Sequence, residues 1–248
     1  HNEQEVEQAL RIVEEYEHSR NLHPADVKDE VDREVEEIIR KVEALDTSKS
    51  SKPKAFPTNR ILVLDGAMGT IIQQYQLREE DFRGARFANH DYDLKGCNDV
   101  LSLTCPFIVR DIHRKYLEAG ADIIETNTFN AQRISMSDFG IQDYCREINL
   151  AAVKIARQCA DEFSSSAKPR FVVGSIGPTS RTTSVDTSGI PLPKEQLSEA
   201  YEEQIKALRD GGVDGLLKKT IFDVENALIA IEAAKRIAPG LPLMLSFS

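Results

Sequence analysis

The sequence lacks three things that would each define a class of protein: a long apolar run, paired cysteines and an excess of basic residues. No stretch of about 18 apolar residues occurs, and the chain is charged from Glu3 onward, so we expect neither a membrane span nor a secretory signal. The 31 basic residues are outnumbered by 41 acidic ones, which gives a net charge of −10 at pH 7. This balance argues against nucleic acid or an anionic membrane as the main partner and favours a small molecule or another protein.

The spacing of the four cysteines fits neither a metal site nor a disulfide framework. They form no CxxC pair and have no histidine at metal spacing, and they are Cys97, Cys105, Cys145 and Cys159. We interpret them as buried or half-buried free thiols in a reducing compartment. Together with the missing signal, this predicts a cytoplasmic protein.

The shares of apolar and charged residues, 41% and 29%, predict a soluble globular chain, and its first 46 residues are strongly acidic. Residues 1–46 hold 15 acidic and 6 basic side chains. Apolar residues recur there at helical spacing over 3–20 and 25–45, with a short connection at 21–24, which predicts an acidic helical hairpin. The Ser/Lys/Pro-rich stretch 47–59 is typical of a linker.

From residue 60 onward, short apolar runs alternate with longer helical patterns, as in βα units around a parallel sheet. The predicted strands are 61–64, 121–125, 170–174, 215–217 and 241–246, and the predicted helices are 106–118, 143–163, 194–210 and 223–237. The phrase Gly-x-Asp precedes two of the strands, ending in Asp122 and Asp214. A complete barrel takes roughly 250 residues, more than 60–248 supplies. We therefore predict an α/β domain over 60–248 with about five βα units, either a smaller open sheet or part of a (β/α)8 TIM barrel.

In such folds the ligand lies beyond the carboxyl ends of the strands, so the residues after each apolar run are the candidates for chemistry. Residues 65–70 offer a carboxylate that suits an ammonium and glycines that allow close backbone approach; a plain turn is the alternative. Residues 125–129 are more polar than a turn requires, although Asn127 or Thr128 capping the next helix is the other interpretation. Residues 174–179 are typical of a compact turn.

Three further features stand out along this part of the chain. The polar excursion 77–104 is long for a connection, which favours a functional lid or rim. His113 lies in a helical pattern and is interpreted as a surface or core histidine. Lys218 and Lys219 interrupt a predicted strand that should be apolar along its length if it is buried on both faces.

Five phrases in this part of the chain resemble the homocysteine-binding domain of cobalamin-dependent methionine synthase. They are ILVLDGAMGT at 61–70, DFRGARF at 81–87, DLKGCND at 93–99, EAGADIIETNTF at 118–129 and GSIGPT at 174–179. The resemblance covers about residues 60–248. Within the polar excursion, the motifs RFxxH at 86–90 and LKGxND at 94–99 are more similar to the cobalamin-dependent enzyme than to its betaine or S-methylmethionine homologues.

The resemblance implies a TIM barrel in which a zinc ion, held by three cysteines, binds homocysteine as the thiolate that accepts a methyl group from methylcobalamin, ultimately from 5-methyltetrahydrofolate. Metal binding deprotonates a thiol that is otherwise protonated at neutral pH. Cobalamin and folate modules of a longer protein are the implied partners. The resemblance implies that the amino-acid end of homocysteine is contacted by Asp65, Gly66 and Ala67. It implies that the same opening of the barrel is lined by Thr126, Asn127, Thr128 and Phe129.

The sequence departs from this family in its metal ligands and in one strand. The family's metal cysteines follow the sixth strand and lie near the eighth, and none of the four cysteines here matches them. We therefore expect no zinc or cobalamin bound by this chain and no methyltransferase activity of it alone. Where the family reads Leu-Ile-Glu-Thr, this chain reads Leu216-Leu-Lys-Lys-Thr220, and Lys219 would repel the ammonium that the family's carboxylate attracts.

Two expectations concern contacts with other molecules. A sheet that ends after its fifth strand leaves an open edge, which predicts self-association unless the hairpin over 1–46 covers that edge. The alternative function belongs to another class: a non-catalytic binding or scaffold protein that contacts a partner protein through the hairpin.

Overall fold

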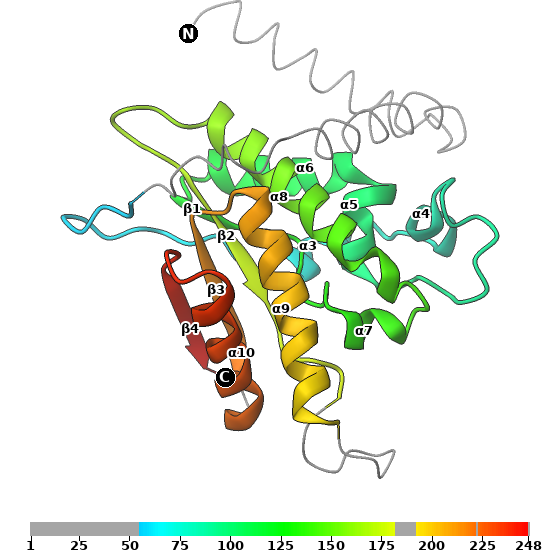
Figure 1. Ribbon diagram of the computed structural model, residues 1–248. Coiled ribbons are helices and arrows are strands. Elements are labelled where there is room, and N and C mark those ends of the chain that lie inside the picture. The colour runs from blue at the N-terminus through cyan, green and yellow to red at the C-terminus, as the bar shows by residue number, and fades with distance from the viewer. Residues whose placement is uncertain (1–54, 182–191, 222, 248) are drawn as a thin grey trace, which may run out of the picture.

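A four-stranded parallel sheet forms the centre of the computed structural model, which describes residues 55–181, 192–221 and 223–247 (Figure 1). Its strands lie in chain order: β1 (Ile123–Glu125), β2 (Phe171–Ile176), β3 (Gly215–Ile221) and β4 (Leu243–Phe247). Parallel strands in sequential order, joined by helices, are the arrangement of a partial (β/α)8 barrel, so the predicted fold class is confirmed. The predicted hairpin over 1–46, and the first part of the predicted linker, lie outside the described residues.

Four long helices follow the predicted pattern closely. They are α6 (Pro106–Glu118), α8 (Cys145–Glu162), α9 (Lys194–Gly211) and α10 (Val224–Ile237). Pro106 occupies the first turn of α6, where its missing N–H costs nothing. Asp223 caps α10 by accepting a hydrogen bond from the Asn226 N–H at 3.1 Å. Figure 1 shows α8, α9 and α10 on one side of the sheet.

Shorter elements make up the remaining connections of the described chain. They are α3 (Met68–Gln74), α4 (Glu79–Arg83), η2 (Asn98–Val100), α5 (Leu101–Thr104), α7 (Arg133–Ser137) and η3 (Gln142–Tyr144). None of the described helices is long and apolar enough to span a bilayer.

The two faces of the sheet bury different apolar layers because side chains alternate along a strand. On the outer face, Ile124, Val172 and Leu216 pack beneath the helices in the main core. On the inner face, a smaller layer is formed by Ile123, Phe171, Val173 and Leu217, with Phe56, Leu62 and Met244 packed against it. The ring of Phe56, which falls in the predicted linker, lies 4.9 Å from the ring of Phe171.

The first predicted strand, 61–64, is reduced in the structure to one parallel bridge between Leu64 and Ile123. The Val63 carbonyl and the Asp65 N–H still bond β1, but Ile61 is 90% exposed and Val63 is 55% exposed. Apolar side chains that contact little gain little from burial, so this segment stays irregular. The strand prediction is therefore wrong for most of this segment.

The repeated Gly-x-Asp phrase has a structural explanation at the amino ends of the strands. The Asp122 carboxylate accepts the Val63 N–H at 2.9 Å and pairs with Arg60. The Asp214 carboxylate accepts the Val172 N–H at 2.9 Å and pairs with Arg157 at 2.7 Å. Each aspartate thus binds the backbone of the preceding segment in the sheet, a contact that fixes register at the face of a barrel that serves stability.

The cysteines and His113 lie in the interior. All four thiols are free and buried, as predicted. His113 is fully buried in α6, which settles its position as a core histidine, and burial lowers its pKa to about 4. A neutral imidazole is therefore the form that the core contains near pH 7.

Candidate active site

A polar layer replaces the inner apolar layer at the carboxyl ends of the strands. Two residues beyond Ile123, Val173 and Leu217, the same face presents Glu125, Ser175 and Lys219. Asp65 completes the group, because its carboxylate oxygens accept the Glu125 N–H at 3.0 and 3.1 Å. We call these four residues, Asp65, Glu125, Ser175 and Lys219, the mouth.

Glu125 is the centre of the mouth. It is 9% exposed, and its Oε2 accepts hydrogen bonds from Lys219 Nζ at 2.7 Å and from Ser175 Oγ at 3.0 Å. A buried carboxylate needs such partners, because an unpaired charge in the interior is costly. Lys219 therefore neutralises the negative charge of Glu125. This ion pair explains how a lysine can occupy a largely buried strand.

Asp65 is held in an environment that opposes its charge. Burial, and then the nearby Glu125 carboxylate, raise the pKa of Asp65 to about 8, although the Glu125 N–H and Lys219 act in the opposite direction. Near pH 7 its folded form is therefore mainly the neutral acid. A neutral acid is a hydrogen-bonding group and no longer an anion that attracts an ammonium.

Thr126 and Thr128 join the ends of β1 and β2. The Ser175 N–H donates to Thr126 Oγ1 at 3.0 Å, and Thr128 Oγ1 donates to the Ser175 carbonyl at 2.8 Å. The two hydroxyls lie 2.6 Å apart, and because Thr128 has given its proton to Ser175, the Thr126 hydroxyl donates to it. Both threonines are buried, so they form the wall behind the mouth.

Asn127 points away from the threonine wall toward the excursion at 77–104, which we call the rim. Its Nδ2 donates to the Asn98 carbonyl at 2.8 Å. Asp99 makes a second contact between the rim and the loop after β1, since its Oδ1 accepts the Asn130 N–H at 2.8 Å. Burial raises the Asp99 pKa to about 7. The next helix, α7, is capped by Gln132, so the alternative in which Asn127 or Thr128 caps it is wrong.

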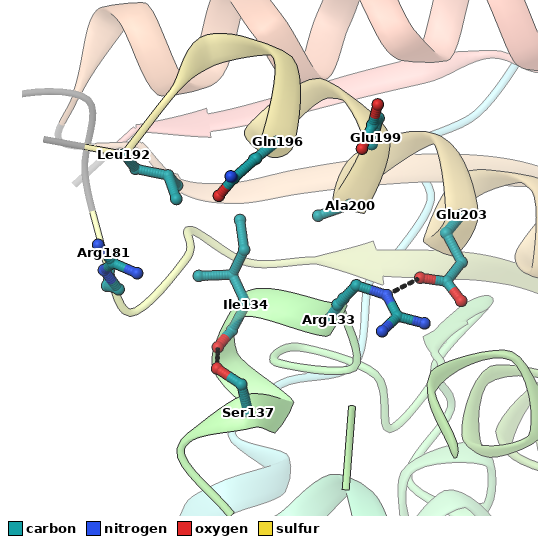
Figure 2. A pocket seen from close by; sticks show the side chains of 9 residues that line it. All are labelled: Arg133, Ile134, Ser137, Arg181, Leu192, Gln196, Glu199, Ala200 and Glu203. Carbon is teal, nitrogen blue, oxygen red and sulfur yellow. Dashed lines mark hydrogen bonds and ion pairs between the residues drawn. The ribbon is translucent and has the colours of Figure 1, made fainter. Parts of the chain in front are cut away.

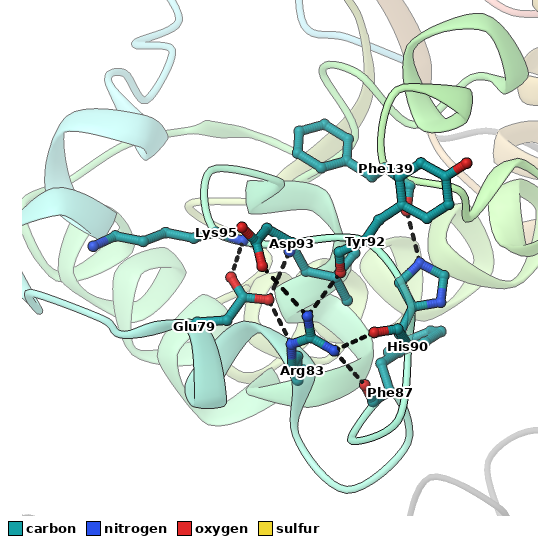
Figure 3. A network of polar contacts seen from close by, with 9 residues as sticks. Glu79, Arg83, Phe87, His90, Tyr92, Asp93, Lys95 and Phe139 are labelled. Atoms are coloured by element: carbon teal, nitrogen blue, oxygen red, sulfur yellow. Dashed lines mark hydrogen bonds and ion pairs between the residues drawn. The ribbon is translucent and has the colours of Figure 1, made fainter.

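The rim has its own internal network, centred on Arg83 (Figure 3). Arg83 pairs with Glu79 at 2.6 Å and donates to the carbonyls of His90 at 2.6 Å and Tyr92 at 2.9 Å. The second Glu79 oxygen accepts the Lys95 N–H at 2.7 Å. These bonds hold the excursion as a folded wall beside the mouth, which favours the rim interpretation over that of a lid.

The other candidate residues lie at the edges of this region. Gly66 and Ala67 are exposed at the start of α3, and Phe129 is half-buried. The Phe129 carbonyl accepts the Gly177 N–H at 2.9 Å, and a Cβ at position 177 would lie only 2.4 Å from that carbonyl oxygen. Glycine is therefore required at 177 for the two strand ends to approach this closely.

Lys218 points to the opposite side of β3 and contacts the helices. It is 1% exposed, and its Nζ lies 5.4 Å from the centre of the Tyr201 ring. Burial lowers its pKa to about 8. The pairing with β4 shifts between Lys218 and Ile221, and Thr220 has a φ of 55°. The strand is irregular here and directs the two lysines to opposite faces, Lys218 to the ring of Tyr201 and Lys219 to the carboxylate of Glu125.

The described residues do not fit the zinc ion that the resemblance implies. Within 55–181, 192–221 and 223–247, no three His, Cys, Asp or Glu side chains group as metal ligands. Burial raises the pKa of every cysteine, for example to about 12 for Cys105 and to about 11 for Cys159. A zinc ligand must be a thiolate, and these surroundings favour the thiol.

A separate hollow of about 280 Å³ lies between α7 and α9 (Figure 2). Arg133 spans part of it and pairs with Glu203 at 3.2 Å. The lining residues are Arg133, Ile134, Ser137, Arg181, Leu192, Gln196, Glu199, Ala200 and Glu203. It shares no residue with the mouth.

The fold and the mouth define a partial (β/α) barrel whose polar residues gather at the carboxyl ends of its strands. The family model of homocysteine S-methyltransferases matches residues 62–248, and the chain belongs to that family. This finding confirms the resemblance at the level of the family.

Solved structures of the homocysteine methyltransferase MmuM from Escherichia coli have a similar fold. The metallated form gives a TM-score of 0.61 at 20% identity, over 77% of this chain and 64% of that chain. The oxidized form gives 0.59 at 21% identity, over 75% and 62%. The chain thus spans less than two thirds of the length of these relatives.

Sequence reasoning missed the role of Ser175 and the pairing of Lys219. Ser175 lies in a phrase that is typical of a turn, and only the register of β2 beside β1 places its hydroxyl on Glu125. Lys219 was expected to repel a ligand's ammonium, but its contact with Glu125 could not be deduced from a position 94 residues away in the chain. The strand alternation Leu217-Lys218-Lys219 indicates only that the two lysines point to opposite faces of the sheet.

Proposed function

We propose that the mouth binds homocysteine and presents its thiol as a methyl acceptor. The observation that carries this proposal is the convergence of Asp65, Glu125, Ser175 and Lys219 at the strand ends of a homocysteine S-methyltransferase family member. Polar groups gathered at this end of a parallel barrel are the usual place for substrate binding. Gly66 and Ala67 then contact the amino-acid end of the ligand.

The finer assignment, to the cobalamin-dependent branch, rests on the two phrases that fall in the rim. The motifs at 86–90 and 94–99 resemble that branch more than its betaine or S-methylmethionine homologues, and the rim that contains them is bonded to Asn127. We propose a methyl donor carried on cobalamin and folate modules of a longer protein, in a cytoplasmic setting that suits four free thiols.

We expect this chain to bind homocysteine without forming methionine by itself. The physical reason is that homocysteine must react as a thiolate, and the described donor set fits no metal that would lower the thiol pKa. Calorimetry with homocysteine, with and without added zinc, measures binding, and methionine formation with methylcobalamin measures turnover. We expect equal binding in both titrations and no methionine.

Two variants test whether this binding occurs at the mouth. Ser175→Ala removes the hydroxyl that positions Glu125, and if the ligand must then spend about 1 kcal/mol to order this carboxylate, binding becomes roughly fivefold weaker. Ser180→Ala, at an exposed position, is the control and should bind as the unmodified chain does. Methionine formation that depends on the chain, or zinc-dependent binding, would contradict the proposal of an inactive chain.

We also propose that the chain self-associates through β4. Within the described residues, β4 pairs only with β3, and Leu245 and Phe247 are 42% and 72% exposed. An unpaired edge with apolar side chains invites a second strand. Sedimentation velocity should show an average mass that rises with concentration, and Phe247→Lys should reduce this rise. Phe107→Lys, at an exposed residue of α6, is the control, and a concentration-independent monomer would refute the idea.

A further inference from the structure

Lys219 differs from the other mouth residues because it brings a positive charge to the inner face of β3. Its side chain is 30% exposed, whereas that of its partner Glu125 is 11% exposed. The lysine therefore lies between a buried carboxylate and the open side of the mouth, where a ligand arrives. Its neighbour Lys218 points to the other side of the strand and takes no part.

The Lys219 ammonium occupies the place that a ligand's ammonium would need. Glu125 Oε2 already accepts two donors, Lys219 Nζ at 2.7 Å and Ser175 Oγ at 3.0 Å. At Oε2 a ligand cation would compete with an ammonium that is tethered to the chain and hence present at high effective concentration. Asp65 offers little replacement, because both its oxygens accept the Glu125 N–H and burial raises its pKa to about 8.

The same ammonium suits a ligand's carboxylate. An ammonium has three N–H donors, and among the described residues Lys219 Nζ donates one hydrogen bond, to Glu125. A second carboxylate on the exposed side of Nζ would make a charge-assisted hydrogen bond, which is stronger than a neutral one.

We propose that Lys219 determines ligand specificity: it binds the carboxylate of the ligand and takes the place of the ligand's ammonium beside Glu125, so that the mouth selects small thiol carboxylates and gains little from an amino group. This inference rests on the proposed function, since it concerns the orientation and class of ligand at the same mouth.

Three thiols that differ by one group test the inference on the full chain. Homocysteine has both charged groups, 4-mercaptobutanoate lacks the amino group, and 3-mercaptopropylamine lacks the carboxylate. By calorimetry we expect 4-mercaptobutanoate to bind at least as tightly as homocysteine, and 3-mercaptopropylamine to bind at least tenfold more weakly.

Charge variants at position 219 provide the second arm. Lys219→Gln should remove most of the preference for a carboxylate, and Lys219→Glu should reverse it, so that 3-mercaptopropylamine becomes the better ligand of the two single-charge thiols. Lys235→Glu, at an exposed position of α10, makes the same change of charge outside the mouth and should keep the original order. Circular dichroism establishes whether each variant is folded. If Lys219→Glu does not fold, Lys219→Gln alone still tests the preference for a carboxylate.

The outcomes separate the two proposals. Homocysteine binding with an unchanged order of ligands in Lys219→Gln would overturn the role of Lys219 and leave the proposed function standing. Tighter binding of 3-mercaptopropylamine than of 4-mercaptobutanoate by the unmodified chain would also overturn it. No binding of any of the three thiols would overturn both.

Discussion

Replacing Asp214 with alanine should destabilise the protein by about 2–4 kcal/mol, because it leaves a buried N–H and a largely buried guanidinium without their carboxylate. Asp214 is 3% exposed and accepts hydrogen bonds from the Val172 N–H at 2.9 Å and from Arg157 at 2.7 Å. The first of these bonds joins the amino ends of β3 and β2, which are the two inner strands of the sheet. Urea unfolding, followed by circular dichroism, measures the change in the free energy of unfolding.

Arg157 also provides the matched control for this prediction. Its other carboxylate partner, Asp161, lies 3.9 Å away on the same helix and its side chain is 56% exposed. Asp161→Ala should cost less than about 0.5 kcal/mol, as is usual for surface pairs. Equal losses in the two variants would show that Asp214 acts only as a charge partner of Arg157 and that its bond to β2 contributes nothing.

Asp65→Asn should remove a pH dependence of stability that the unmodified chain has between about pH 4 and pH 8. An unfolded aspartate releases its proton near 3.8, whereas burial and Glu125 raise the folded pKa of Asp65 to about 8. Over this window the folded chain holds a proton that the unfolded chain has lost, so its stability falls as pH rises, by up to about 1.4 kcal/mol per pH unit. Above about pH 8 this contribution is fully lost.

Asparagine resembles the neutral acid and does not titrate, so the variant should become progressively more stable than the unmodified chain from pH 5 to pH 8. The other ionisable groups near Asp65, which are Glu125, Lys219 and Tyr116, stay in place in the variant. Urea unfolding at pH 5, 6.5 and 8 measures the difference between the two proteins. Asp138→Asn, at an exposed residue, should leave the pH profile unchanged. Parallel profiles for Asp65→Asn and the unmodified chain would refute the prediction.

The sequence predicts those elements whose local signals agree with their burial. Pro106 and the helical spacing after it place α6 at its observed bounds, and the apolar run after Asp122 places β1. The segment 61–64 has the same apolar character but remains mostly irregular. Leu62 packs on the inner layer, but Ile61 and Val63 contact little within the described part of the chain, and strand formation depends on neighbours more than on composition.

The location of the mouth could be predicted from the sequence, but the hydrogen bonds within it could not. Strand ends in a parallel barrel meet at one edge, so the candidates Asp65 and Thr126 were found from the phrases that follow the apolar runs. Which groups bond to each other depends on register, and the Lys219–Glu125 pair joins β3 to β1 across the face of β2. A contact between non-adjacent strands leaves no local signal in a single sequence.

The rim is attached to the strand ends at two points, through Asn127 and through Asp99. Its own backbone is bound by Arg83, so the conformational entropy of this segment is lost during folding rather than when a ligand arrives. Recognition on this side of the mouth therefore depends on a preorganised shape, and association requires no closure step of the rim. Differences in affinity between ligands should then appear mainly in their rates of departure.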